Sequence, residues 1–227
     1  MDSSYELWKL SVLASFMKPH LHPDQTVLDL GCGDGLLETI LKETEVHITG
    51  IDLSDSSIQS ANARQIPNCL FLKDDALNFL KKSEKYYDVI IASAFLGALD
   101  HAQLISFADM SWNHLKPGGR QIIFISNKHP LYTLLSPDRV WSRWTWKHYS
   151  KKDIKTIFQH FKQIEIETFG SKKTFWREFY HALYASLKAR GLKLPQPKNE
   201  TLHFWNNEYK GTRYLLFVFE KPNNSTT

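Results

Sequence analysis

The sequence predicts an α/β fold in which a largely parallel sheet is covered by helices on both faces. Segments typical of strands and of helices alternate along residues 25–126. The strand segments are short and apolar and lack a polar face, which is typical of strands buried between two layers of helices. In such sheets ligands bind beyond the carboxyl ends of the strands. Residues that directly follow a strand are therefore the first candidates for a functional site.

Five strands and four helices are predicted in the first part of the chain. A helix over residues 5–17 is ended by the prolines at positions 19 and 23. Ser54 or Asp55 is expected to cap a later helix, and the sequence LKPGG is expected to end the last one. The predicted strands are 26–30, 47–52, 69–75, 86–94 and 120–126, and the other predicted helices are 34–44, 54–64 and 102–115.

The second half of the chain is less regular. Residues 150–161 are predicted to form a helix that Ser150 and Asp153 cap. Strands are predicted over 164–170 and 212–222, separated by a long insertion with one predicted helix over 174–190. Long connections are often functional. Aromatic residues in this insertion and around positions 141–149 could line an apolar pocket or could pack only on one another.

The composition is that of an ordinary globular domain. The 227 residues are 42% hydrophobic and 23% charged, and the formal net charge of +4 is only weak evidence for a nucleic-acid partner. The two cysteines lack a metal-ligand spacing and favour a reducing, cytoplasmic setting. No metal site, signal peptide or membrane span is predicted, because the N-terminus is polar and no run of about 18 apolar residues occurs.

The clearest motif is VLDLGCGDG, residues 27–35. Gly31, Gly33 and Gly35 alternate between a predicted strand and a predicted helix. Without Cβ atoms a ligand can lie against the backbone, although a tight turn alone would also explain these glycines. The spacing G-x-G-x-G, with Asp29 two positions upstream, differs from the dinucleotide fingerprint, and the Lys-Ser/Thr pair of a P-loop is absent. Neither a pyrophosphate nor a nucleoside triphosphate is the favoured ligand.

Acidic residues follow the next two predicted strands. Asp52 ends the second strand, where a carboxylate can accept hydrogen bonds from both hydroxyls of a ribose, or can simply cap a helix. Asp74 and Asp75 follow the third strand. A carboxylate there can accept a hydrogen bond from an exocyclic amine such as that of adenine, or can be an ordinary solvated loop acid.

These motifs together resemble the ordered motif series of the class I S-adenosylmethionine-dependent methyltransferases. The likeness covers roughly residues 25–126, with VLDLGCGDG, GIDLS, KDDAL, YDVIIAS and LKPGG in order. It implies a Rossmann-like seven-stranded sheet with strand order 3-2-1-4-5-7-6 and strand seven antiparallel. It also implies S-adenosyl-L-methionine as the cofactor and methyl transfer as the activity.

The resemblance implies a single methyltransferase domain over residues 1–227. Its parts would be an N-terminal helix over 1–24, a cofactor-binding core over 25–126, and variable substrate-side segments over 127–150 and 171–211. The two variable segments carry the aromatic clusters and would form a helical cap.

The resemblance also assigns roles to single residues. Asp29 and the loop glycines would line the methionine part of the cofactor. Asp52 would hold the ribose and Leu53 would pack against adenine. Asp75 would accept from the adenine amine beside the backbone N–H of Ala76, although Asp74 is an alternative by one residue. The implied cofactor-binding residues are Asp29, Gly31, Gly33, Gly35, Asp52, Leu53, Asp75, Ala76, Ser93 and Phe95, the last two near the sulfonium and its methyl group.

The methyl acceptor is not encoded in these motifs. The stretch FLGALDH after the fourth strand resembles small-molecule and lipid-quinone methyltransferases. His129 is the candidate general base if the acceptor must lose a proton, with a structural role as its alternative. The expected substrate is a small, partly apolar molecule. The alternatives are methylation of tRNA or rRNA and a non-catalytic, cofactor-binding partner subunit, and the sequence predicts neither the acceptor atom nor the oligomeric state.

Overall fold

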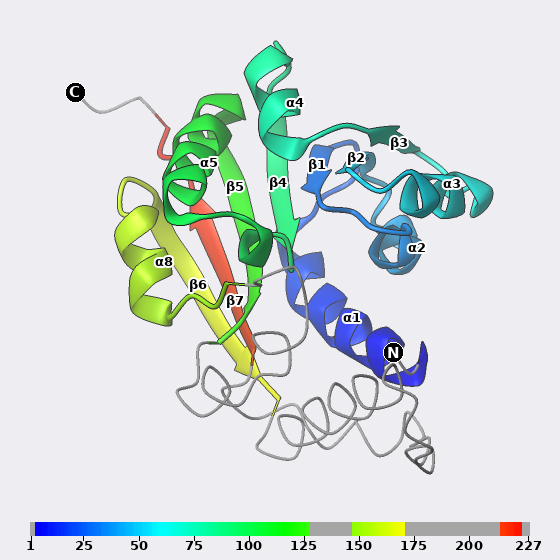
Figure 1. Ribbon diagram of the computed structural model, residues 1–227, viewed down its shortest axis with the longest axis horizontal. Coiled ribbons are helices and arrows are strands. Elements are labelled where there is room, and N and C mark those ends of the chain that lie inside the picture. The colour runs from blue at the N-terminus through cyan, green and yellow to red at the C-terminus, as the bar shows by residue number, and fades with distance from the viewer. Residues whose placement is uncertain (1–2, 128–146, 171–213, 224–227) are drawn as a thin grey trace, which may run out of the picture.

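The computed structural model describes residues 3–127, 147–170 and 214–223, and Figure 1 shows how their helices and strands are arranged. One seven-stranded sheet has the order β3-β2-β1-β4-β5-β7-β6. The predicted order is thus confirmed. The strands are β1 Thr26–Leu30, β2 His47–Asp52, β3 Cys69–Lys73, β4 Tyr87–Ser93, β5 Leu115–Ser126, β6 Lys162–Phe169 and β7 Tyr214–Glu220.

Helices connect and cover these strands. Strands β1 to β5 pair in parallel, whereas β7 lies antiparallel between β5 and β6, as predicted. None of the helices described is long and apolar enough to span a membrane. The α-helices are α1 Ser3–Met17, α2 Leu36–Leu41, α3 Asp55–Ala63, α4 Ala76–Lys82, α5 His101–His114 and α8 Lys151–Ile157, and the 3-10 turns are η1 Lys18–His20, η2 Lys42–Thr44 and η3 Leu96–Ala98.

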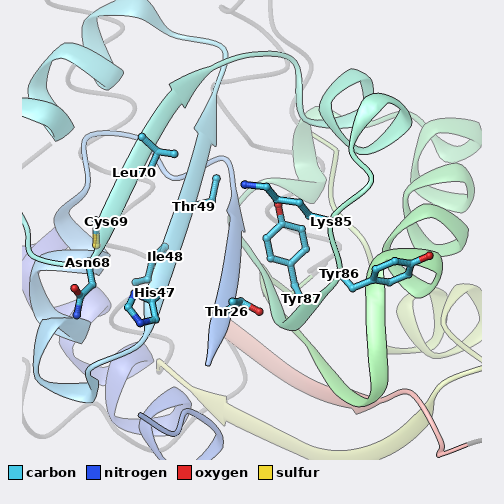
Figure 2. Close-up of a pocket in the computed structure, with 10 residues that line it drawn as sticks. All are labelled: Thr26, His47, Ile48, Thr49, Asn68, Cys69, Leu70, Lys85, Tyr86 and Tyr87. Carbon is cyan, nitrogen blue, oxygen red and sulfur yellow. The ribbon is translucent and has the colours of Figure 1, made fainter. Parts of the chain in front are cut away.

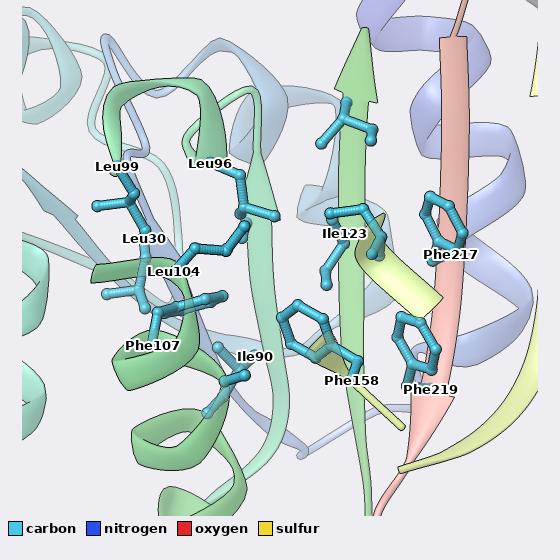
Figure 3. Close-up of a cluster of buried hydrophobic side chains, with 14 of the residues drawn as sticks. Leu30, Ile90, Leu96, Leu99, Leu104, Phe107, Ile123, Phe158, Phe217 and Phe219 are labelled. Atoms are coloured by element: carbon cyan, nitrogen blue, oxygen red, sulfur yellow. The ribbon is translucent and has the colours of Figure 1, made fainter. Parts of the chain in front are cut away.

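The inner strands of the sheet bury both of their faces, as their apolar sequences predict, whereas the edge strands β3 and β6 are only partly buried. One face packs against α1 and α2 through side chains such as Trp8 and Leu37. The other packs against α4, α5 and α8, where Phe107 and Phe158 meet the sheet (Figure 3). Because side chains alternate along a strand, Val27 faces α1 and α2 while its neighbour Leu28 faces α5. The same alternation turns Asp29 toward α1 and α2.

Two helix caps expected from the sequence are present. Ser54 accepts a hydrogen bond from the backbone N–H of Ser57 at 3.2 Å, so Ser54 rather than Asp55 caps α3. Ser150 and Asp153 form a complete capping box at the start of α8.

Three elements differ from the sequence prediction. Helix α4 was not expected, and the helix expected over 34–44 is split into α2 and η2. Strand β5 begins at Leu115, so LKPGG belongs to the strand and does not merely end α5. The reason is pairing with the chain directly after β7: Gly118 N–H donates to Lys221 C=O at 2.8 Å, and Lys221 N–H donates to Gly119 C=O at 2.9 Å. The helix predicted over 174–190 lies outside the described residues.

Candidate active site

The glycine loop joins β1 to α2 at the carboxyl end of the sheet. Its three glycines all have positive φ, at 82° for Gly31, 58° for Gly33 and 76° for Gly35. Only glycine adopts such angles without strain. Backbone N–H groups of Gly31 and Cys32 both donate to the Ile51 carbonyl, at 2.8 and 3.1 Å. The loop is therefore fixed to the end of β2.

The surroundings of the three glycines differ. A Cβ at Gly31 would lie 3.1 Å from Cβ of Phe95, and one at Gly35 would lie 3.1 Å from Cβ of Ala61 and 3.2 Å from the Phe71 ring. A Cβ at Gly33 would have no heavy atom within 4 Å. Gly33 thus presents an open stretch of backbone, while its two neighbours are packed against protein.

Asp52 holds this loop in place. Its Oδ2 accepts a hydrogen bond from Gly33 N–H at 3.0 Å, and its Oδ1 accepts one from Ser54 N–H at 2.8 Å. The next residue, Leu53, leaves 62% of its surface exposed. A carboxylate and an exposed apolar side chain therefore lie beside the open side of the glycine loop, where the sequence predicts the ribose and adenine.

Both acids of the Asp74–Asp75 doublet fix the start of α4. Asp75 Oδ1 caps the helix by accepting from Asn78 N–H at 2.9 Å, and Asp74 Oδ1 accepts from Asp75 N–H at 2.8 Å. Asp74 N–H in turn donates to the Asp52 carbonyl at 3.2 Å, which ties the doublet to the end of β2. Ala76 is the buried first residue of α4. The choice between the two acids as the adenine acceptor stays open.

The carboxyl end of β4 lies beside the glycine loop. Ser93 ends the strand, and Ala94 turns the chain with a positive φ of 54°. The Phe95 side chain then lies against Gly31 and meets the Phe107 ring edge-on, with ring centroids 5.7 Å apart. The structure thus places Phe95 against the glycine loop, and Ser93 lines the same cavity as this loop; their position near the reacting methyl group stays a prediction.

A cavity of about 130 Å³ lies between the glycine loop, α1 and the ends of β4 and β5. Its lining combines apolar side chains with charged groups from α1 and β1. The Lys9 ammonium and the Glu6 carboxylate, both on α1, form an ion pair of 2.6 Å there. The lining residues are Glu6, Lys9, Leu10, Asp29, Gly31, Cys32, Asp34, Leu36, Leu37, Ser93, Ala94 and Phe124.

Asp29 is the unusual member of this lining. Its side chain is only 2% exposed, and its Oδ1 has no hydrogen-bond donor among the described residues. Burial raises the pKa of Asp29 well above its usual range, and the neighbouring Glu38 and Asp52 carboxyl groups add to the effect. A buried carboxyl without a donor that lines a cavity is placed to meet a cationic ligand group.

Glu38 lies behind Asp29 and was not predicted as a site residue. It stands in the first turn of α2 and has no exposed surface. Burial raises the pKa of Glu38, and neither of its carboxyl oxygens has a hydrogen-bond partner among the described residues. The sequence carried one signal: Glu38 follows the buried Leu37 and precedes Leu41 by three residues, so it lies on the buried arc of the helix.

A larger pocket, of about 460 Å³, lies at the opposite end of the sheet (Figure 2). It is lined by residues at the amino ends of the strands, including Thr26, His47 and Tyr87. Parallel α/β sheets bind ligands at their carboxyl ends, so volume does not identify the site here. No group of three or more His, Cys, Asp or Glu in the described parts of the chain could hold a metal ion.

The two cysteines are free, and neither is placed as a nucleophile. Burial raises the pKa of the Cys69 thiol to about 12 and raises that of Cys32 still further. His129, the candidate base, lies outside the described residues, as do most of the predicted cap segments.

Comparison with known proteins agrees with this geometry. Residues 27–119 match a family model described as a methyltransferase domain. The chain is 33% identical over 109 residues to a ubiquinone biosynthesis O-methyltransferase of Rickettsia canadensis, and 30% identical over 110 residues to a trans-aconitate 2-methyltransferase of Deinococcus radiodurans. These alignments cover 45% and 47% of this chain but 43% and 40% of those proteins. The chain thus spans less than half the length of these curated relatives.

Solved structures show the same fold over nearly the whole chain. A SAM-dependent methyltransferase from Archaeoglobus fulgidus has a TM-score of 0.66 at 19% identity, covering 93% of this chain and 94% of that one. The N-methyltransferase NodS from Bradyrhizobium japonicum has a TM-score of 0.61 at 15% identity, covering 98% of this chain and all of that one.

The sheet order is that of the Rossmann-like methyltransferase fold. Residues 27–119 thus resemble a methyltransferase domain, and solved S-adenosylmethionine-dependent methyltransferases share the fold of this chain.

Proposed function

We propose that this protein transfers a methyl group from S-adenosyl-L-methionine to an oxygen of a small, partly apolar molecule. The observation that carries the proposal is the buried Asp29 carboxyl, whose Oδ1 has no hydrogen-bond partner among the described residues, in the cavity between the glycine loop and α1. The cofactor has an ammonium group that such a carboxyl would bind. The oxygen acceptor is supported by the two curated relatives, one named an O-methyltransferase of ubiquinone biosynthesis and the other a trans-aconitate 2-methyltransferase.

The described residues fit this cofactor. Gly33 offers open backbone, Asp52 ends the neighbouring strand, and Leu53 exposes an apolar side chain beside it. We assign Asp29 to the methionine end, Asp52 to the ribose, and Leu53 to the adenine. Ser93 and Phe95 would lie near the reacting methyl group, and Asp75 or Asp74 would reach the adenine amine.

The bound cofactor supplies a methyl group on a sulfonium, which is a good leaving group. The protein therefore has mainly to orient the acceptor and to exclude water. The apolar lining of the cavity, with Leu10, Leu37 and Phe124, serves the second task. A general base is needed only for an acceptor that keeps its proton at neutral pH, and His129 stays a prediction for that role.

Cofactor binding is tested by calorimetry with S-adenosylhomocysteine on the Asp52→Ala variant. Loss of the carboxylate frees Gly33 N–H and removes the proposed ribose contact, so the affinity should fall by about tenfold or more. Asp55→Ala is the matched control, because Asp55 lies nearby but pairs with Lys73. Equal affinities of the wild type and Asp52→Ala would contradict the assignment.

The acceptor class is tested by incubation with labelled methyl donor and separated fractions of small molecules, RNA and protein. Label should enter the small-molecule fraction. A methyl ester, which alkali hydrolyses, or a methyl ether of a phenol would identify an oxygen acceptor. Label in tRNA or rRNA would instead favour the RNA alternative. Tight cofactor binding without transfer to any fraction would favour a non-catalytic partner subunit.

A further inference from the structure

The second half of the glycine loop is held by one arginine at the end of helix α3. Arg64 directly follows α3, and its own backbone N–H donates to the Ala61 carbonyl at 3.1 Å. Its guanidinium donates from Nε to the Asp34 carbonyl at 2.6 Å and from Nη2 to Oδ2 of the Asp34 carboxylate at 2.5 Å. Both acceptors belong to one residue, so Arg64 fixes the backbone and the side chain of Asp34 together.

The glycine loop has other attachments to the fold. Its first half is hydrogen-bonded to the end of β2, and Gly35 lies so close to α3 that a Cβ there would be 3.1 Å from Cβ of Ala61. The side chains of Arg64 and Asp34 are 32% and 49% exposed, and ion pairs at such exposure contribute little to stability. The contact is therefore not required to hold the fold, and its place beside the proposed cofactor cavity indicates a role in binding.

Asp34 lines the cavity that we assign to the methionine end of the cofactor. Of the described residues, three acids and one base line this cavity. Glu6 is paired with the base, Lys9, at 2.6 Å, and Asp29 is assigned to the ammonium group. The third acid is Asp34, and Arg64 is its only ion-pair partner in the described part of the chain. An unpaired charge on Asp34 would repel the carboxylate of the methionine end and compete with Asp29 for the ammonium group.

We propose that Arg64 is a positioning residue for the cofactor: it neutralises Asp34, so that the cavity accepts the methionine end with its carboxylate. The inference rests on the proposed function, because it places that end of the cofactor in this cavity. A guanidinium suits the task because it keeps its charge at neutral pH and its planar fork can hold two acceptors at once. Arg64 itself lies outside the lining and acts through Asp34.

The test measures by calorimetry the affinity of Arg64→Ala for two ligands. S-adenosylhomocysteine carries the ammonium and carboxylate groups of the methionine end, whereas 5′-methylthioadenosine keeps the adenosine and the sulfur without them. The affinity of Arg64→Ala for S-adenosylhomocysteine should fall by about fivefold to tenfold, because Asp34 is left unpaired. Its affinity for 5′-methylthioadenosine should change by less than about twofold, because that ligand has no charge for Asp34 to act on.

A second substitution tests the neutralisation directly. Asp34→Ala removes the charge that Arg64 compensates, so the double variant Arg64→Ala/Asp34→Ala should recover an affinity for S-adenosylhomocysteine within about threefold of wild type. Lys73→Ala is the matched control. Lys73 pairs with Asp55 at the start of α3, at 3.3 Å, so its loss removes the same charge from the protein without touching the glycine loop. Lys73→Ala should bind both ligands like the wild type.

Urea unfolding of the ligand-free variants controls for damage to the fold, and the midpoint of Arg64→Ala should stay close to that of wild type. The proposal is overturned if that midpoint falls sharply, if Arg64→Ala binds S-adenosylhomocysteine with wild-type affinity, or if it loses affinity for both ligands equally. It is also overturned if the double variant binds as weakly as Arg64→Ala. Failure of the wild type to bind either ligand would refute the proposed function, and this inference with it.

Discussion

At the residue scale, the three glycines of the loop have different surroundings and therefore different roles. Gly31 and Gly35 are packed against Phe95, Ala61 and Phe71, whereas Gly33 faces open space. All three adopt positive φ. The packed glycines therefore serve the stability of the loop, whereas we expect the missing side chain of Gly33 to leave room for the proposed cofactor.

This difference predicts distinct effects of two alanine substitutions. Gly35→Ala adds steric contact at 3.1 Å to backbone strain, so it should lower the free energy of unfolding by about 2–4 kcal/mol. Gly33→Ala should cost only the strain, about 1–2 kcal/mol, but its added methyl group should weaken S-adenosylhomocysteine binding by about tenfold or more. Thermal unfolding and calorimetry measure the two effects. Full binding by Gly33→Ala would show that the open side of the loop does not hold the cofactor.

The residues that could be predicted from the sequence are those whose role depends on chain position. Asp29 lies near the end of β1, Asp52 ends β2 and the loop glycines follow β1. The carboxyl ends of parallel strands lie at one edge of the sheet. Glu38 could not be found this way, because its place depends on burial against the sheet behind Asp29. The cavity is likewise unpredictable from the sequence, since α1 supplies Glu6 and Lys9 from about twenty residues upstream of the loop.

At the element scale, a single carboxylate joins three neighbouring strands at their amino ends. Asp88, on β4, accepts hydrogen bonds at Oδ2 from the Thr26 backbone N–H at 2.8 Å, the Thr26 hydroxyl at 2.7 Å and the Lys116 ammonium at 2.7 Å. Thr26 begins β1 and Lys116 lies near the start of β5. Asp88 lies where the β4–β5 register shifts between Tyr87 and Val89.

The Asp88 cluster predicts a pH-dependent contribution to stability. Burial alone would raise the pKa of Asp88, but the hydrogen bonds from Lys116 and Thr26 outweigh burial and lower the pKa. A carboxyl whose folded-state pKa is lowered stabilises the protein above its unfolded-state pKa, and this contribution is lost as the pH falls through the folded-state value. The loss should thus occur below about pH 4.

Asp88→Asn tests this contribution. At pH 7 the variant should unfold with a free energy about 1–2 kcal/mol lower than wild type, because it loses charge-assisted hydrogen bonds. The difference should shrink as the pH falls below about 4, and cofactor affinity should not change at neutral pH. Urea denaturation at several pH values measures the difference in unfolding free energy between the wild type and Asp88→Asn. A difference that stays constant at every pH would show that the Asp88 carboxylate charge is not its cause.

The sequence missed helix α4 because it is short, and missed the early start of β5 because that start depends on tertiary pairing. Helix α4 has only seven residues, too short for hydrophobic periodicity to reveal, and it begins where Asp75 caps it. The early start of β5 depends on pairing with Lys221, about one hundred residues later. A Cβ at Gly119 would lie 2.8 Å from the Lys116 carbonyl and 3.0 Å from the Asp88 carbonyl, so the second glycine of LKPGG is required by strand packing.

At the scale of the whole molecule, the cofactor half and the later strands form one sheet. The family match ends at residue 119, yet β7 pairs with β5 along seven residues, and the core beneath α5 includes Phe158, Phe217 and Phe219. A single domain over residues 1–227 stays a prediction. The late strands nevertheless complete the packing of β5, whose Phe124 lines the proposed cofactor cavity.

The larger pocket and the proposed site lie at opposite ends of the sheet, so substitutions in the two cavities should affect cofactor binding differently. Ser93→Leu adds a side chain to the smaller cavity, whereas Tyr86→Ala removes one from the larger pocket, where Tyr86 is 62% exposed. A ligand at one hundred times its dissociation constant stabilises the folded state by about 2.7 kcal/mol. S-adenosylhomocysteine should therefore raise the unfolding temperature of Tyr86→Ala as much as that of wild type, and should raise that of Ser93→Leu much less. Unfolding without ligand controls for damage to the fold. If Ser93→Leu kept the full shift and Tyr86→Ala lost it, the cofactor would bind at the amino ends of the strands.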